Sequence, residues 1–542
     1  MKRLFGNTGG LKANQVRRLE NLYRRRTPPE NIITAELARD LSRLSHELRR
    51  QIGLLINRSG KIEYVIVGDS QKILIPDTSD YRTAPGRLRG LRCVHTHLNN
   101  ESLTRDDLTD LALLRLDIMA AITATKDGMP NRVHMGHILP ENIEEAPYKI
   151  YDPIIPHKLD IGCLELIQAL EDELSQKNLL YKADSGKERA ILASVTSGSE
   201  RREKDQLDEL KELAVSCGIG VAGTFLQQRK HADTRFLLGI GKLQELSILV
   251  LQKGATLIIF DRELNPSQIR SITDKVDLKV IDRSQLILDI FAQRAQSREG
   301  KLQVELAQLK YLLPRLVVKN TAMSRLTGGI GGRGPGETKL EINRRRVRTR
   351  ITHLERNISM VRKQRKQQKA KREKKKLPII SIIGYTNAGK STLLNTLTKS
   401  NVRAENRLFA TLDPSSRRLK FPEDIEVIVT DTVGFIENIP KDLLVAFRAT
   451  LEELEGANLL LHVIDIHNPR VKEQVQSVEK LLADLDLHNI PTLRVLNKQD
   501  LVKREMADRL VESFQGIPIS AKSSDTLIPL ITKMREMVLS TM

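Results

Sequence analysis

Apolar and polar positions alternate in a strand-and-helix pattern in the middle of the chain. Four short apolar runs predict strands at 191–195, 220–226, 255–260 and 278–281. Between them the apolar residues recur with helical spacing, so helices are expected to join the strands. This alternation predicts a small parallel α/β domain over residues 189–290. Gly239 to Lys242 opens one of its helices, where a plain turn is favoured over an anion site.

The first 188 residues mix helical and strand-like runs, which predicts an α+β extension. We expect helices at 11–26, 34–51 and 161–175, strands at 52–57, 64–67 and 72–75, and one further helix that reaches about Thr123. Short strands between turn residues are typical of a β-meander.

Two long helical segments, at 284–316 and 341–376, are separated by a glycine-rich gap. Long helices joined by such a tip are typical of an antiparallel hairpin that carries a flexible finger. Arg333 and Glu337 in the gap favour a finger that contacts another surface over a simple spacer. We therefore expect a helical hairpin over residues 291–376.

A nucleotide-binding pattern begins after the apolar run at 377–383. The run Gly384-Tyr-Thr-Asn-Ala-Gly-Lys-Ser391 comes next and a helical stretch follows it. A strand, a tight turn and a helix N-terminus let backbone N–H groups face phosphates, with Lys390 on the β- and γ-phosphates and the Ser391 hydroxyl on Mg²⁺. Residues 377–542 are expected to form a P-loop domain with a C-terminal helix.

Further motifs follow at the ends of predicted strands. Asp431 supplies a carboxylate for Mg²⁺, Gly434 an N–H for the γ-phosphate, and Thr411 a hydroxyl that completes the metal shell. The carboxylate of Asp500 is able to accept hydrogen bonds from N1–H and the exocyclic amine of guanine. The N–H of Ala521 is able to donate to guanine O6. Adenine lacks those donors, so the set predicts GTP binding.

These motifs define the expected site residues. Catalytic roles are expected for Lys390, Thr411 and Gly434, and Mg²⁺ ligation for Ser391 and Thr411. The expected GTP contacts are Gly384, Tyr385, Thr386, Asn387, Ala388, Gly389, Lys390, Ser391, Phe409, Ala410, Thr411, Leu412, Asp413, Asp431, Thr432, Val433, Gly434, Asn497, Lys498, Gln499, Asp500, Ser520, Ala521 and Lys522.

Phe435 follows Gly434, where many P-loop GTPases carry a glutamine that orients the attacking water. A phenyl ring cannot perform that task. The favoured interpretation is a slow intrinsic GTPase that needs a contribution from a partner. The alternative is that another side chain of the same chain replaces the glutamine.

Composition indicates the class of partner. The chain has 542 residues, enough for three or four domains, and a net charge of +20. Ten of the sixteen residues at 361–376 are Lys or Arg. A dense run of one sign repels itself unless phosphates relieve it, which favours RNA. Aromatic residues are only 3% with no Trp, so base-stacking platforms are not expected.

Cysteines and apolar runs bear on the compartment. Cys93, Cys163 and Cys217 have neither disulfide nor metal spacing, which favours a reducing cytosol. No run approaches the about 18 apolar residues of a membrane helix, and residues 1–8 show no secretory apolar region. We expect a cytoplasmic protein without a membrane span.

A second candidate site lies in the extension. His95 and His97, at the end of a predicted strand with an acid about ten residues on, are able to hold Zn²⁺. The segment resembles the JAB/MPN metalloprotease fold, but Arg50 stands near the place of the catalytic glutamate and Thr104 where serine is usual. No proline follows His97. A degenerate, non-catalytic domain or ordinary strand-end histidines are the favoured interpretations.

Several longer strings are similar to one family. They are Gly239-Ile-Gly-Lys-Leu-Gln-Glu-Leu, Phe260-Asp-Arg-Glu-Leu-Asn-Pro-Ser-Gln, Asp282-Arg-Ser, Glu299-Gly-Lys-Leu-Gln-Val-Glu-Leu-Ala, Gly331-Gly-Arg-Gly-Pro-Gly-Glu-Thr-Lys-Leu-Glu, Gly384 to Ser391, Phe409-Ala-Thr-Leu-Asp-Pro and Asp431-Thr-Val-Gly-Phe. In this order they resemble the HflX family of ribosome-associated GTPases, from about residue 190 onward. Phe435 is that family's own form.

The resemblance implies a Mg²⁺-dependent GTPase that binds the large ribosomal subunit and splits idle or stalled ribosomes. The hairpin finger would reach the peptidyl-transferase region. GTP would order the loops at Thr411 and Asp431 and favour the bound state, and hydrolysis would release it. The implied partners are GTP, GDP and rRNA of the large subunit, and we expect a monomer.

Two rival functions are weighed against this one. A GTPase-regulated factor for RNA maturation or tRNA modification needs a second chemical site, such as a cysteine near the C-terminus, and the sequence has none there. A metal-dependent hydrolase in residues 1–188, regulated by the GTPase, depends on the histidine pair.

Overall fold

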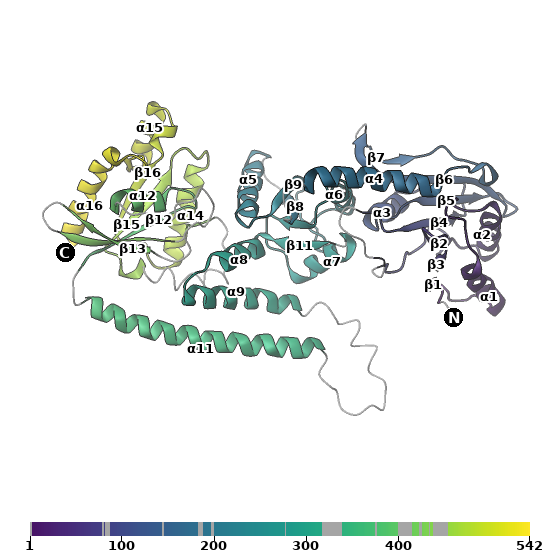
Figure 1. The fold of residues 1–542 in the computed structure, drawn as a ribbon, viewed down its shortest axis with the longest axis horizontal. Helices are drawn as coiled ribbons and strands as arrows, with labels where there is room; N and C mark the ends of the chain where they lie inside the picture. Colours follow the sequence, from purple (N-terminus) through teal and green to yellow (C-terminus); the bar gives the residue numbers. More distant parts are fainter. Residues whose placement is uncertain are drawn as a thin grey trace, which may run out of the picture. The chain divides into compact units, whose positions relative to one another are not determined.

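The computed structural model describes residues 3–78, 81, 87–143, 146–182, 188–196, 200–276, 278–316, 339–373, 377–398, 415–421, 425–432, 434–436 and 454–541. The chain forms two compact units, one of residues 1–207 and 219–281 and one of residues 208–218 and 282–542. Three β-sheets organise these units (Figure 1). The four-part division expected from the sequence, with boundaries after 188, 290 and 376, stays a prediction.

The first sheet belongs to the first unit and has seven strands in the order β1-β3-β2-β4-β5-β6-β7. The strands are β1 (Phe5–Gly6), β2 (Ile52–Asn57), β3 (Ile62–Val67), β4 (Leu91–His97), β5 (Met119–Ala124), β6 (Pro130–Ile143) and β7 (Ala146–Ile150). The accompanying helices are α1 (Ala13–Asn21), η1 (Leu22–Arg24), α2 (Ala35–Leu48), α3 (Arg105–Leu113), η3 (Pro156–Lys158) and α4 (Cys163–Lys182). β4 lies at the centre, antiparallel to β2 and parallel to β5, and all its residues are buried.

The second sheet has four strands in the order β11-β10-β8-β9, and β8 pairs parallel with both β9 and β10. The strands are β8 (Arg189–Thr196), β9 (Gly220–Gln228), β10 (Leu257–Phe260) and β11 (Lys279–Asp282). The helices that alternate with them are α5 (Glu200–Ser216), α6 (Ile240–Lys253) and α7 (Pro266–Val276). This arrangement confirms the small parallel α/β fold predicted from the alternating pattern.

The third sheet lies in the second unit and has the order β13-β14-β12-β15-β16-β17. The strands are β12 (Ile379–Gly384), β13 (Ser415–Lys420), β14 (Glu426–Asp431), β15 (Leu459–Asp465), β16 (Thr492–Asn497) and β17 (Ile517–Pro518). The helices are α12 (Lys390–Thr398), η5 (Leu454–Gly456), α14 (Val471–Asp484), η6 (Gln499–Leu501), α15 (Arg504–Phe514), η7 (Ser524–Leu527) and α16 (Ile528–Thr541). β13 is antiparallel to β14, and β12, β15, β16 and β17 pair in parallel with their neighbours. The carboxyl ends of the parallel strands therefore meet at one edge.

A helical hairpin precedes the third sheet in the chain. It consists of α8 (Arg283–Arg294), α9 (Arg298–Leu316) and α11 (Lys339–Glu373), and α9 and α11 lie side by side and run antiparallel (Figure 1). Leu354 is buried on α11, and Arg350 pairs with Glu305 at 2.7 Å. The hairpin is confirmed, while its expected glycine-rich finger, with Arg333 and Glu337, lies outside the described residues.

Three sequence expectations about elements are wrong. Residues 72–75 form no strand, because β1 pairs with β3 at that edge of the sheet and the turn at Asp69 accepts from the N–H of Lys72. The helix expected to reach about Thr123 ends at Leu113, and β5 follows because its backbone pairs with β4 and β6.

The third wrong expectation is one continuous helix at 284–316. The helix breaks between α8 and α9, where Ala295 has an extended backbone and the Ser297 hydroxyl accepts from the N–H of Gly300. A serine that satisfies a free N–H at a helix start favours a new helix over a continuous one. Among the described residues, no helix has both the length and the apolar character required to cross a membrane.

Candidate nucleotide-binding site

The phosphate-binding turn lies between the central strand β12 and helix α12. β14 and β15 flank β12 in parallel, so the carboxyl end of β12 lies in the middle of the sheet. Gly384 has φ +149°, and a Cβ at this position would lie 2.2 Å from the carbonyl oxygen of Val463. Gly389 has φ +94°, and its Cβ would lie 2.3 Å from Nδ2 of Asn497. Both positions therefore require glycine.

Lys390 begins α12 and points back into the turn. Its Nζ donates to the carbonyl oxygens of Gly384 at 3.1 Å and Tyr385 at 2.8 Å. Burial lowers the pKa of the Lys390 ammonium group to about 8, although the charge of Asp431 opposes this shift. A buried cation next to the N-terminus of a helix favours an anionic ligand, which agrees with the expected phosphate contact.

Ser391 and Asp431 meet at the carboxyl edge of the sheet. Ser391 lies in the first turn of α12 and Asp431 ends β14, and the hydroxyl of Ser391 donates to Oδ2 of Asp431 at 2.6 Å. Hydroxyl and carboxylate oxygens are the ligands that Mg²⁺ prefers. The structure thus brings together one predicted Mg²⁺ ligand and the carboxylate of the second motif, although they are 40 residues apart in the sequence.

The chain after β14 packs directly onto the phosphate-binding turn. The N–H of Thr386 donates to the carbonyl of Phe435 at 2.7 Å, and the N–H of Phe435 donates to the carbonyl of Gly384 at 3.1 Å. Phe435 is 3% exposed, so its ring is part of the packed interior. A Cβ on Gly434 would lie 3.1 Å from Nζ of Lys390, which leaves little room for any residue except glycine.

Asn497 connects the predicted guanine-binding loops to the phosphate turn. Its Nδ2 donates to the carbonyl of Ala388 at 2.7 Å, and its Oδ1 accepts from the N–H of Ala521 at 2.9 Å. Asn497 is buried, so both ends of its amide are satisfied inside the protein. Asp500 is exposed in η6, where its carboxylate is accessible to a base. The expected contact of Ala521 with guanine O6 stays a prediction.

Asp465 is a residue of this site that the sequence analysis missed. It is the last residue of β15, and its Oδ2 accepts from Nζ of Lys498 at 2.6 Å. Lys498 has φ +66°, and this ion pair fixes its side chain beside the base-recognition segment. An acid directly after a mostly apolar strand is the same signal that identified Asp431, so the sequence contained the information.

The remaining expected contacts divide into two groups. The first group has described positions and consists of Asn387, Thr432, Gln499, Ser520 and Lys522. Asn387 has φ +61° in the turn, and Thr432 donates to the carbonyl of Ile382 at 2.7 Å. The expected contacts that lie outside the described residues are Phe409, Ala410, Thr411, Leu412, Asp413 and Val433. The roles of both groups stay predictions.

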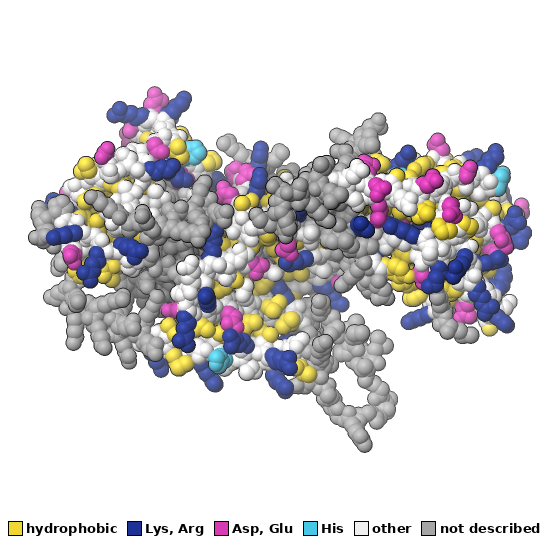
Figure 2. All heavy atoms as spheres, in the orientation of Figure 1, with side chains coloured by type: hydrophobic (Ala, Val, Ile, Leu, Met, Phe, Trp, Pro, Cys, Tyr) yellow, Lys and Arg dark blue, Asp and Glu magenta, His cyan; other side chains and the backbone are white. Residues whose placement is uncertain are grey.

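The second helix of the hairpin presents a basic surface. Arg345, Arg346 and Arg348 of α11 are exposed, whereas Leu354 and Ile358, at helical spacing, are buried. Figure 2 shows Lys and Arg side chains in blue along the segment that Figure 1 labels α9 and α11. Leu354 and Ile358 therefore serve packing, while Arg345, Arg346 and Arg348 lie at the surface.

A glycine-rich turn between a central parallel strand and a helix, a serine beside a strand-end aspartate, and a buried asparagine that bridges two loops define the chain as a P-loop GTPase. Three family models match. The one described as "GTP-binding GTPase N-terminal" covers residues 204–292, "GTP-binding GTPase Middle Region" covers 294–372, and "50S ribosome-binding GTPase" covers 379–498. The chain is a GTP hydrolase.

Curated relatives narrow this class to a family. A GTPase HflX of Caldanaerobacter subterraneus subsp. tengcongensis is 51% identical over 317 residues, which are 58% of this chain and 74% of that protein. The GTPase HflX of Escherichia coli strain K12 is 45% identical over 320 residues, 59% of this chain and 75% of that protein. The chain belongs to the HflX family of GTPases.

A solved structure also matches. It is the crystal structure of a GTP-binding protein from the hyperthermophilic archaeon Sulfolobus solfataricus in complex with GDP, with 25% sequence identity and a TM-score of 0.37. The match covers 66% of this chain and all of that chain.

Proposed function

We propose that the chain is a cytoplasmic GTPase, monomeric when free, that binds the large ribosomal subunit and splits idle or stalled ribosomes, with hydrolysis stimulated by that subunit. The observation that carries the proposal is the basic helix α11, which directly precedes the P-loop strand in the sequence. A matched family model described as a 50S ribosome-binding GTPase supports the same partner.

The charge of α11 supports a polyphosphate partner. Its exposed arginines project from a helix whose apolar side packs on α9, so the basic side is available for binding. Each Lys or Arg that neutralises a phosphate releases a counterion, and binding gains free energy that falls as salt rises. The protein has few aromatic side chains for stacking on bases. Contact with the phosphate backbone of folded rRNA fits this surface best.

The P-loop supplies the switch. Lys390 holds the phosphates and Asn497 holds the base-recognition loops against the turn, so nucleotide binding fixes both at once. Ser391 and Asp431 offer two oxygen ligands in contact, which fits Mg²⁺, and the bound ion would neutralise phosphate charge. The backbone bonds of Phe435 to Gly384 and Thr386 support a coupling between this turn and the chain after β14.

Phe435 supports the dependence on a partner. Its buried ring has no polar group with which to orient a water molecule for attack on the γ-phosphate. Intrinsic hydrolysis is therefore expected to be slow. A ribosomal group, or a residue that the ribosome orders, would complete the site.

Co-sedimentation tests the partner. Purified small and large ribosomal subunits are each incubated with the full chain and GDP, GTP or a non-hydrolysable GTP analogue. The proposal expects pelleting with the large subunit, strongest with the analogue. Pelleting with neither subunit, or equal pelleting with both, would refute the proposal.

A further inference from the structure

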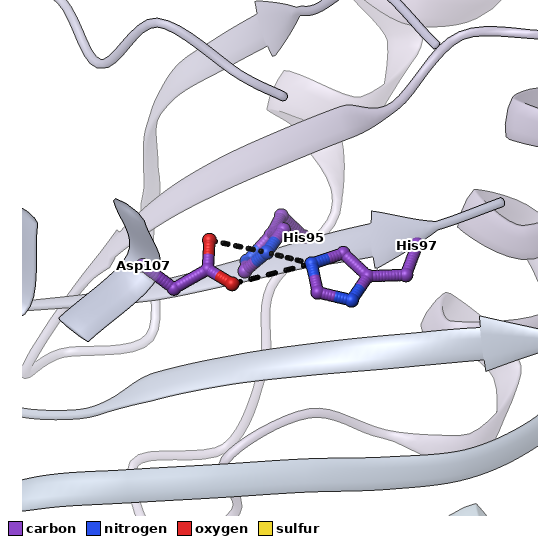
Figure 3. A group of neighbouring side chains, drawn as sticks. All are labelled: His95, His97 and Asp107. Atoms are coloured by element: carbon purple, nitrogen blue, oxygen red, sulfur yellow. Dashed lines mark hydrogen bonds and ion pairs between the residues drawn. The ribbon is translucent and has the colours of Figure 1, made fainter. Parts of the chain in front are cut away.

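Three side chains converge on one point inside the first sheet, far in sequence from the P-loop. His95 and His97 are two residues apart on β4, so both point to the same face of the sheet, and Asp107 lies in the first turn of α3. Nε2 of His95 lies 2.9 Å from Nε2 of His97 and 3.1 Å from Oδ1 of Asp107 (Figure 3). Nε2 of His97 lies 3.3 Å from Oδ2 of Asp107. All three residues are buried.

The spacing of these atoms suits a tetrahedral metal ion. Bonds of about 2.0–2.2 Å from Zn²⁺ to nitrogen and oxygen hold neighbouring ligand atoms about 3.3 Å apart. The three observed distances, 2.9, 3.1 and 3.3 Å, are within a few tenths of an ångström of that value. The group therefore needs little movement to bind an ion.

Hydrogen bonds alone do not account for the triangle. If both histidines donate from Nε2 to Asp107, their two Nε2 donors lie 2.9 Å apart with no acceptor between them. If only one Nε2 is protonated, the bare Nε2 of the other faces a carboxylate oxygen, and two acceptors are in contact. With the Asp107 carboxylate ionised, every placement of protons on the two histidines leaves one edge repulsive. A cation in the centre makes all three edges favourable.

Neighbouring groups orient two of the three side chains, His97 and Asp107, as metal ligands. Nδ1 of His97 lies 3.2 Å from the carbonyl oxygen of Glu101, and an N–H at Nδ1 that donates there leaves the Nε2 lone pair available. Oδ2 of Asp107 accepts from the N–H of Thr104 at 2.7 Å and from its hydroxyl at 2.8 Å. These bonds fix the carboxylate and direct Oδ1 toward His95.

We propose that His95, His97 and Asp107 bind one Zn²⁺ ion that links β4 to α3. Imidazole nitrogens with a single carboxylate favour Zn²⁺ over Mg²⁺ or Ca²⁺, which take mostly oxygen ligands. Three protein ligands leave the fourth tetrahedral position of the ion to a water molecule. Arg50 donates to the carbonyls of Asn7 and Gly9 and offers no carboxylate, so the proposal includes no hydrolytic step.

The site is independent of the proposed ribosomal function because its ligands belong to the first compact unit and the P-loop to the second. A failure of one proposal therefore leaves the other standing. Expectations from the sequence favoured a non-catalytic domain or ordinary strand-end histidines, and the proposed ion is compatible with the non-catalytic domain.

Metal analysis of the full chain, purified without a histidine tag, tests the proposal. The wild-type protein, stripped with a chelator and then given Zn²⁺, is expected to retain one ion per chain after gel filtration. His95→Asn, His97→Asn and Asp107→Asn should each weaken Zn²⁺ affinity by more than about 100-fold, because loss of a ligand exceeds loss of a supporting group. His137→Gln is the matched control, since His137 is buried in the same sheet and bonds Tyr151. It should retain the ion.

Co²⁺ in place of Zn²⁺ provides a measurement on the unmutated protein, which keeps the test valid if a variant fails to fold. The expected result is the intense visible absorption of a tetrahedral cobalt site, removed by added Zn²⁺. GDP binding by each variant reports that the second unit is intact. A wild-type chain that binds neither metal, or ligand variants that bind as well as His137→Gln, would overturn the proposal.

Discussion

Lys390 is the residue at which charge and burial conflict most strongly in the nucleotide site. Burial lowers the pKa of its ammonium group from the ordinary 10.5 to about 8. The charged form therefore destabilises the fold below about pH 8, and this cost is relieved as pH rises from 8 toward 10.5. Phosphates stabilise the charged form, so we expect nucleotide binding to raise the pKa of Lys390.

Proton uptake follows from this shift. At pH 8.5 a group with a pKa of about 8 is roughly three-quarters deprotonated, so GDP binding should take up roughly that fraction of a proton per chain. At pH 6.5 the contribution of Lys390 to proton uptake should be close to zero. Calorimetry in two buffers of different ionisation enthalpy measures it. Binding with no proton exchange at pH 8.5 would show that Lys390 is already charged.

The Lys390→Ala variant removes the cation itself. We expect loss of tight GTP binding, by more than about 100-fold, because charge-assisted hydrogen bonds to phosphate are lost in a buried site. Fluorescent GTP titration measures the change. Lys503→Ala, at an exposed position before α15, is the control and should bind as the wild type does. Near-normal affinity of Lys390→Ala would contradict the assigned role.

The variant Asp500→Asn tests whether Asp500 recognises guanine. Asp500→Asn should lower GTP affinity by about two or more orders of magnitude and raise that for xanthosine triphosphate, whose N1–H and carbonyl pattern matches an amide. Competition binding with both nucleotides measures the preference. Asp508→Asn, an exposed carboxylate on α15, should leave it unchanged. Unaltered GTP affinity in Asp500→Asn would assign the base contact elsewhere.

At the residue level, the sequence predicted the parts of the site that are local strings. The turn from Gly384 to Ser391 is contiguous, so its strand and helix context could be read directly. The bridge from Asn497 to Ala388 joins segments 109 residues apart, and no local pattern contains it. Asp465 was predictable, since its strand-end position carries the same signal as Asp431.

Individual elements are held by packing that the sequence pattern described only in part. Alanine and methionine favour helix, so the break at Ala295 and the strand β5 were missed. The Ser297 hydroxyl that accepts from the N–H of Gly300 decides the break, and pairing with β4 decides the strand. The hairpin was predictable because its two segments are long and separated by glycines. Local propensity determined where the isolated helices form, and pairing with distant strands determined where the strands form.

Leu354 tests the packing of the hairpin. It is fully buried on α11, so Leu354→Ala should destabilise the hairpin by roughly 2–5 kcal/mol through lost burial and a cavity. Hydrogen exchange of the α11 amides should accelerate accordingly. Met360 on the same helix is 57% exposed, and Met360→Ala should cost little. Equal exchange in both variants would show that α11 is not held by this contact.

The lysines of the basic run test the proposed rRNA contact at the level of one element. Replacing the lysines from Lys369 to Lys376 with glutamine should weaken binding to the large subunit. The slope of log affinity against log salt should fall by roughly 0.7–0.9 for each lost phosphate contact. Binding measured between low and physiological salt gives the slope. An unchanged slope would assign the rRNA contact to another surface.

At the scale of the whole molecule, two sheets and the helical hairpin carry distinct features within one chain. The six-stranded sheet carries the P-loop, the hairpin carries exposed positive charge, and the seven-stranded sheet carries the histidine pair. The family matches begin at residue 204, so the seven-stranded sheet lies outside the matched regions. Sequence reasoning identified the GTPase because its motifs are short and ordered. It did not decide the function of residues 1–188, because the side chains of His95, His97 and Asp107 come from two elements that meet only in the fold.

In the proposed function, a guanine nucleotide switch acts on the large ribosomal subunit. The most direct test is the rate of GTP hydrolysis by the purified full chain at saturating GTP, measured alone and with purified large subunits. We expect slow hydrolysis alone and an acceleration of at least about tenfold with large subunits, since the proposal has a partner complete the site beside Phe435. The same slow rate in both conditions would contradict it.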